Sequence, residues 1–121
     1  MKALFYLKSC STCQRIIDAW QPPKEVLLVD IKSTPLGQEQ LEAMYQRSES
    51  YEALFSKRAR LYQERGLKNQ VLEEKDYKAL ILENYTFLKR PVLIWENKIS
   101  IGNSKKSVVL AREWIHGSEK N

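Results

Sequence analysis

An α/β fold, with a four-stranded mixed sheet and an inserted helical segment, is predicted by three features of this sequence. Two strand-like runs flank a helical run within residues 2–31. Helical patterns then fill the middle of the chain. Two further strand-like runs and a final helix close it. The 121 residues are enough for one domain with a single core.

The first segment predicts a β-α-β unit. Its strands are the short buried run KALFYL (2–7) and the apolar, β-branched run EVLLVDI (25–31). From about Ser11, apolar residues recur at helical spacing: Ile16, Ile17 and Trp20. The Pro22-Pro23 pair ends this helix. Because so few residues join the two strands, we expect a crossover helix between parallel strands.

The middle segment predicts helices only. We expect one helix to begin with Thr34 as its N-cap and Pro35 as its first residue. Its apolar stripe continues through Leu41, Met44 and Tyr45. Further helical patterns cover residues 51–67, with Gly66 as a C-cap, and residues 73–84.

The last segment predicts a β-hairpin followed by a helix. The strands are PVLIW (91–95) and KISI (98–101), the helix covers residues 104–115, and the tail 117–121 is expected to fray. The element order, β-α-β, helices, β-β-α, is that of a thioredoxin-like fold. Within one domain, 1–121, we expect a thioredoxin-like core from residues 1–33 and 88–117 and a helical insertion from residues 34–87.

The charge of the chain is mildly basic. Lys and Arg outnumber Asp and Glu by 20 to 15, a formal net charge of +5 that is spread along the sequence. This balance favours anionic ligands but is unlike the basic stripe of a nucleic-acid-binding protein. No run approaches the ~20 apolar residues of a membrane helix, and the N-terminus lacks a secretory signal. We therefore expect a cytoplasmic protein, and a monomer, that binds neither nucleic acid directly nor membranes.

The motif Cys10-Ser11-Thr12-Cys13 stands where the first predicted strand ends and the first helix begins. A helix N-terminus presents unpaired N–H groups and a partial positive charge, which stabilise a thiolate and lower the pKa of Cys10. Cys13 falls on nearly the same helical face and can resolve an intermediate as a disulfide. The N–H groups of this turn, at Ser11 and Thr12, can also bind an oxyanion.

Two other interpretations of the cysteines stay open. The pair could be half of a zinc site, but a second pair is lacking and the sole histidine, His116, is near the C-terminus. We interpret His116 as a charge partner of the last helix. The cysteines could also be ordinary buried residues. The strand-to-helix position favours redox use, and we expect no bound metal or organic cofactor.

Basic residues supply the remaining candidates. Pro91 is either a cis-proline facing the thiol loop or an ordinary strand-start proline. Arg90, just before it, would point its guanidinium toward Cys10, an arrangement suited to oxyanion binding. In the run Lys57-Arg58-Ala59-Arg60, the default expectation for the charged side chains is a solvated helix face.

Four segments together resemble the arsenate reductase (ArsC) and Spx family of thioredoxin-fold proteins. They are FYLKSCSTC, LFSKRARLYQERGLKN (54–69), LKRPVLIWENKISIGN (88–103) and the closing amphipathic helix. By this resemblance, Cys10 matches the catalytic cysteine that attacks bound arsenate, and Arg90 precedes the family's cis-proline, here Pro91. Arg58 matches a further oxyanion-binding arginine. Glutathione and glutaredoxin would then restore the thiol.

The chain also departs from the arsenate reductase pattern. The family's Ser and Arg after the catalytic cysteine are replaced by Cys13 and Gln14, and a third arginine is replaced by Asn103. The CxxC pair resembles that of Spx, a redox-sensing regulator that binds the RNA polymerase alpha subunit.

The first hypothesis for the function is a thiol-dependent oxidoreductase acting on a small oxyanion or a disulfide, with glutaredoxin or thioredoxin as its partner. The second is an Spx-like regulator switched by a Cys10–Cys13 disulfide. A third is a domain that kept the fold and lost the activity.

Overall fold

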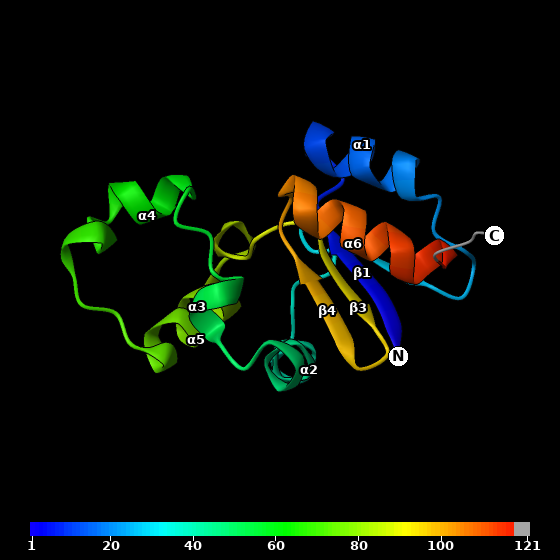
Figure 1. The fold of residues 1–121 in the computed structure, drawn as a ribbon. Coiled ribbons are helices and arrows are strands. Elements are labelled where there is room, and N and C mark those ends of the chain that lie inside the picture. Colours follow the sequence, from blue (N-terminus) through cyan, green and yellow to red (C-terminus); the bar gives the residue numbers. More distant parts are fainter. Residues whose placement is uncertain (118–121) are drawn as a thin grey trace. The chain divides into compact units, whose positions relative to one another are not determined.

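A computed structural model describes residues 1–117 of the chain. The predicted frayed tail, apart from Gly117, lies outside these residues. The chain divides into two compact units: residues 1–34 together with the segment from Arg90 onward, and Pro35–Lys89 (Figure 1). That the two make one domain stays a prediction. None of the helices within residues 1–117 has the length and apolar character needed to cross a membrane.

The first unit contains the sheet. Its strands are β1 (Lys2–Tyr6), β2 (Leu27–Asp30), β3 (Val92–Trp95) and β4 (Lys98–Ile101). They are arranged in the order β2-β1-β3-β4. Strands β1 and β2 are parallel, whereas β1 with β3 and β3 with β4 are antiparallel. The predicted four-stranded mixed sheet is confirmed. In the parallel pair Tyr6 lies beside Asp30, so both strands end at the same edge of the sheet.

Two helices, α1 (Ser11–Trp20) and α6 (Lys105–His116), lie together on one face of this sheet (Figure 1). Their shared core contains apolar residues from both helices, from β1 and β3, and from the segment before β2: Leu4, Ile16, Trp20, Val26, Leu93 and Ala111. Burial of these side chains supplies the main stabilising force. Trp20 also donates a hydrogen bond from Nε1 to the Val108 carbonyl oxygen at 3.0 Å, which joins α1 to α6.

The second unit is helical, as predicted. It contains α2 (Gln38–Ser48), α3 (Tyr51–Leu54), α4 (Arg60–Glu64) and α5 (Glu74–Glu83), with the short 3-10 turns η1 (Leu67–Asn69) and η2 (Tyr85–Phe87). Phe55, 1% exposed, is central to its core. The Phe55 ring stacks on Phe87 at 5.2 Å between centroids and contacts Tyr77 at 4.9 Å.

The predicted start of the first inserted helix is wrong. Helix α2 begins after Gly37, whose N–H donates to Gln40 Oε1 at 2.8 Å. Thr34 instead donates its N–H to the Asp30 carbonyl oxygen at 2.9 Å, in a turn that follows β2. The N-cap is therefore Gly37 and not Thr34, and the Gln40 side chain bonds back to its N–H.

The predicted continuous helix over residues 51–67 is also wrong. The chain leaves the helix after Leu54, because Phe55 pairs with Leu88 in an isolated antiparallel bridge. Ser56 donates its N–H to the Phe87 carbonyl oxygen at 2.7 Å, and Lys89 donates to that of Leu54 at 2.8 Å. These long-range backbone bonds replace the helical ones, so part of the Lys57–Arg60 run lies in a turn.

Candidate thiol site

Cys10 stands at the junction of β1 and α1, as the sequence predicts. Its N–H donates to the Leu7 carbonyl oxygen at 3.0 Å and closes a turn directly after β1. Its own carbonyl oxygen accepts the first helical hydrogen bond, from Gln14 N–H at 3.1 Å. With φ −91° and ψ 114°, Cys10 has the extended backbone of an N-cap residue. The thiol is therefore partly exposed at the helix N-terminus.

Several groups act on the Cys10 thiol. Burial raises its pKa, but the surrounding donors outweigh burial and hold the pKa below the ordinary value. These donors are the backbone N–H and the side chain of Cys13 and the backbone N–H of Thr12, and the positive charge of Arg90 adds to them. All of them favour the charged form, as expected at the first turn of a helix. The lowered pKa enlarges the fraction of Cys10 that is present as the nucleophilic thiolate at neutral pH.

Cys13 has the opposite electrostatic character. It is fully buried on α1, and burial raises the pKa of its thiol to about 11, opposed by a hydrogen bond from the Leu7 backbone. The thiol remains protonated near neutral pH and is hydrogen bonded to the Cys10 sulfur. Both cysteines are free. The arrangement therefore places a protonated thiol against one whose pKa is lowered.

The structure brings most of the predicted site residues into the first unit. Arg90 is close enough for its charge to lower the pKa of Cys10, and its peptide bond to Pro91 is cis. Ser11 and Thr12 form the first turn of α1, as predicted. The Thr12 N–H acts on the Cys10 sulfur. What these residues do for a substrate stays a prediction.

Arg58 belongs to the second unit. It is exposed, in the turn that precedes α4. Its neighbour Lys57 forms an ion pair with Glu52 at 2.9 Å, Nζ to Oε2, so that side chain is held by a local partner. The role of Arg58 as an anion ligand stays a prediction.

No group of three side chains that could hold a metal ion occurs among residues 1–117. His116, at the end of α6, shares a hydrogen bond between Nε2 and the Trp20 carbonyl oxygen. It thus meets the C-terminal end of α1, where a carbonyl is left without a helical partner.

A polar network that was not predicted from the sequence joins the turn before Cys10 to β2 and α1. Asp30 Oδ1 accepts from the backbone N–H of Lys8 at 3.3 Å, and Gln14 Nε2 donates to the Lys8 carbonyl oxygen at 3.1 Å. Asp30, an acidic residue at the end of the apolar run that forms β2, was the available signal, because ligands and polar groups gather at the carboxyl ends of parallel strands.

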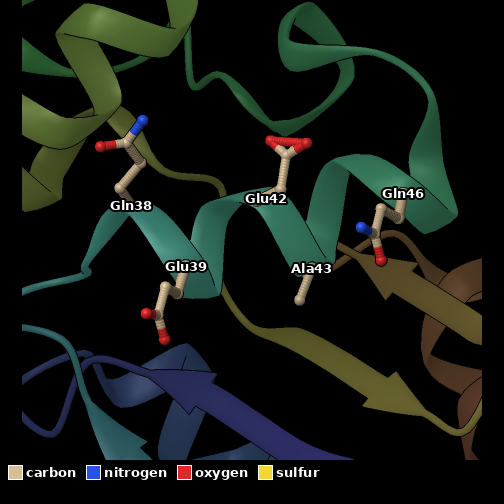
Figure 2. A pocket seen from close by; sticks show the side chains of 5 residues that line it. All are labelled: Gln38, Glu39, Glu42, Ala43 and Gln46. Carbon is tan, nitrogen blue, oxygen red and sulfur yellow. The ribbon is translucent and has the colours of Figure 1, made fainter.

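A second feature that the sequence did not indicate is a hollow of about 410 Å³ along α2. Its lining residues all come from this helix: Gln38, Glu39, Glu42, Ala43 and Gln46. Figure 2 shows Glu39 and Glu42 directed away from each other, so the polar groups do not converge on one point. No basic or sulfur-containing side chain lines the hollow, and it lacks the chemistry of the thiol site.

The fold and the site together define a thioredoxin-like protein with a cysteine pair at the start of its first helix. The family model for the ArsC family matches residues 5–109. The chain belongs to the ArsC family.

The chain is similar to curated relatives in sequence and to solved structures in fold. The global transcriptional regulator Spx of Enterococcus faecalis is 28% identical over 111 residues, which cover 89% of this chain and 83% of that protein. Spx of Bacillus subtilis is 24% identical with 89% and 84% coverage. The arsenate reductase of Vibrio cholerae has a similar structure, with a TM-score of 0.73 and 17% identity, covering 90% of this chain and 95% of its own. That last likeness is one of fold.

Proposed function

We propose that this chain is a thiol-dependent oxidoreductase in which Cys10 is the nucleophile and Cys13 the resolving thiol. The observation that carries the proposal is the contrast between the two adjacent sulfurs. The pKa of Cys10 is lowered and that of Cys13 is raised to about 11. One sulfur is thus available for attack while its neighbour keeps a proton.

With arsenate as substrate, the electrons and atoms balance without a cofactor. The Cys10 thiolate attacks arsenic(V), forms a sulfur–arsenic bond and displaces one oxygen as water. The thiol of Cys13, or of glutathione, then loses its proton to solvent, and its sulfur attacks the Cys10 sulfur and breaks that bond. Arsenic leaves as arsenite, reduced by two electrons, and the two sulfurs are oxidised to a disulfide. Arg90 and the first-turn N–H groups would offset the negative charge during the attack.

With a disulfide as substrate the same pair carries out exchange. The Cys10 thiolate attacks one sulfur and releases the other as a thiolate. Cys13 then displaces the mixed disulfide and leaves Cys10–Cys13 oxidised. In both cases glutathione with glutaredoxin, or thioredoxin, would reduce the pair for the next turnover.

The test is turnover by purified protein with arsenate, and separately with a low-molecular-weight disulfide, in the presence of glutathione and glutaredoxin. Cys10→Ser should abolish both reactions. Cys13→Ser should slow them, and in a single turnover without glutathione only the wild type should release arsenite. Activity that survives in Cys10→Ser would contradict the assignment of the nucleophile, and folded wild type inactive on both substrates would contradict the enzymatic proposal.

The second candidate is a redox-sensing regulator. Two observations favour it: relatives named as global transcriptional regulators match 89% of the chain, and the two thiols are hydrogen bonded to each other. We would expect the protein to bind the RNA polymerase alpha subunit in a manner that changes with the Cys10–Cys13 disulfide. A binding assay with purified subunit under oxidising and reducing conditions tests this, and no binding in either state would exclude it.

A further inference from the structure

The turn that carries Cys10 is held on both sides at one residue, Lys8. The N–H of Lys8 donates to Asp30 Oδ1 at 3.3 Å, and its carbonyl oxygen accepts from Gln14 Nε2 at 3.1 Å. Lys8 stands two residues before Cys10, inside the turn that the hydrogen bond from Cys10 N–H to the Leu7 carbonyl oxygen closes. Both backbone polar groups of Lys8 are therefore bonded to side chains.

Asp30 connects this turn to the next strand. It is the last residue of β2 and lies beside Tyr6, the last residue of β1. Its Oδ1 also accepts from Lys32 N–H at 3.3 Å, and its Oδ2 accepts from the Ser33 hydroxyl at 2.9 Å. The Ser33 hydroxyl and the backbone N–H groups of Lys8 and Lys32, together with the charge of Lys8, hold the pKa of the Asp30 carboxyl below its usual range.

Gln14 makes the contact from the other side. It is the fourth residue of α1, and its backbone N–H bonds to the Cys10 carbonyl oxygen. Its side chain turns back to the Lys8 carbonyl oxygen. The helix start and the preceding turn are thus bonded through both the backbone and the side chain of one residue.

We propose that Asp30 and Gln14 are positioning residues, which hold the Lys8 backbone between them and thereby keep the Cys10 sulfur at the N–H groups of α1. This inference rests on the proposed function, in which Cys10 is the nucleophile. In the contacts given above, the side chains of Asp30 and Gln14 bond to the Lys8 backbone and not to the Cys10 sulfur. Each acts through the turn, because a displacement of about 1 Å is enough to weaken a preorganised site.

The direction in which Asp30→Ala changes the pKa of Cys10 distinguishes a positioning role from a direct electrostatic effect. Removing a carboxylate near a thiolate removes an unfavourable like charge and should lower the pKa of Cys10. Loss of the Asp30 acceptor should instead loosen the turn, carry the sulfur away from the Thr12 and Cys13 N–H groups and raise that pKa. Asp30→Ala therefore gives opposite outcomes under the two explanations.

The experiment measures the rate of Cys10 alkylation by iodoacetamide from pH 5 to pH 9, with the modified cysteine identified by mass spectrometry. For Asp30→Ala and Gln14→Ala we expect the rate at pH 7 to fall about 3–10-fold, the change given by up to one pKa unit. Asp30→Asn keeps an oxygen acceptor and should restore the wild-type profile. Ser33→Ala, which removes only a contact to Oδ2, is the matched control and should leave the profile unchanged.

The double variant tests whether both residues act through the same turn. If they do, Asp30→Ala combined with Gln14→Ala should be little slower than the slower single variant, because neighbouring sites are not additive. Independent, fully multiplied effects would overturn the shared mechanism. Should Asp30→Ala fail to fold by circular dichroism, Gln14→Ala decides the question alone.

Failure of this inference is distinguishable from failure of the proposed function. Suppose that the pKa of Cys10 is lowered in the wild type and is the same, or lower still, in folded Asp30→Ala and Gln14→Ala. That result overturns the positioning role only. An ordinary thiol pKa for Cys10 in the wild type overturns the nucleophile assignment, and the positioning role falls with it.

Discussion

The two compact units use their polar side chains for different purposes. In the first unit, Asp30 and Gln14 bond to the backbone of the turn that carries Cys10. In the second unit, bonds of the same kind cap the start of a helix. Glu74 accepts the N–H groups of Tyr51 and Glu52 at 2.6 and 3.0 Å, at the start of α3. The same chemistry, a side-chain oxygen accepting backbone N–H groups, thus supports a thiol loop in one unit and short helices in the other.

The cores differ in the same way. The first unit packs α1 and α6 on the sheet through a mainly aliphatic core around Trp20. In the second unit the ring of Phe55 contacts those of Phe87 and Tyr77, and two of the helices, α3 and α4, have only four and five residues. Short helices are marginal by themselves and depend on packing and caps. We therefore expect changes in the second unit to alter stability and changes around Cys10 to alter reactivity.

The largest expected effect is on stability, from Phe55→Ala. Removing a buried ring that contacts Phe87 and Tyr77 should lower the free energy of unfolding by about 3–5 kcal/mol. Urea unfolding measures the loss, and Phe55→Leu should lose less. Under conditions where the variant is folded, the alkylation profile of Cys10 should match the wild type. A shifted profile would show that the second unit also controls the thiol.

The next effect lies inside the first unit and contrasts its two thiols. Both thiols react as thiolates, so the Cys10 rate should level off at a lower pH than the Cys13 rate, which continues to rise toward pH 11. At pH 8 we expect Cys10 to react at least about 100-fold faster with iodoacetamide, since each pKa unit is a factor of ten in thiolate. Comparable rates at pH 8 in the folded protein would remove the asymmetry on which the function rests.

A smaller effect is expected from the cap of α3. Glu74→Ala removes the acceptor for the Tyr51 and Glu52 N–H groups and should lower the free energy of unfolding by about 1–2 kcal/mol. Glu42→Ala is the control, because Glu42 contacts the hydroxyl of Tyr51 at 3.2 Å and no backbone group of α3. Equal losses in the two variants would contradict the capping role.

The smallest effect comes from the ends of two helices. Glu49 follows α2 with φ 57° and Gln21 follows α1 with φ 48°, a region that favours glycine. Glu49→Gly should raise the free energy of unfolding by about 0.5–1 kcal/mol. Gln21→Gly should gain less, because it loses the bond from Nε2 to the Asp18 carbonyl oxygen at 2.8 Å. A larger gain at Gln21 would contradict this account.

Local pattern predicted the first unit well. The helix expected from about Ser11 to Trp20 is α1, with the same bounds, and the hairpin strands are β3 and β4. These elements are long enough to show their periodicity and are bounded by strong breakers such as Pro22-Pro23. The second unit was predicted as helical, yet the break at Phe55 was missed. Its cause, the bridge to Leu88, lies far away in the sequence.

The candidate site likewise has a part that could be predicted from contiguous residues and a part that could not. The Cys10–Cys13 pair at a helix start could be predicted because the strand, the motif and the helix are contiguous. The network through Asp30 could not, because it joins residues that are 22 positions apart. Gln14 was noticed only as a departure from a family pattern, since nothing local shows that its side chain turns back to Lys8.

The amino-acid sequence was enough to predict the fold class and the placement of Cys10 at the start of a helix. Both predictions follow from periodicity, breakers and motif spacing, which are properties of neighbouring residues, whereas the family was indicated by a resemblance in four segments. The folded structure was needed to show which polar groups bond to the thiol turn, where the second helical stretch breaks and how the two thiols differ. Those outcomes depend on burial and on hydrogen bonds between distant segments, and both arise only when the chain is folded.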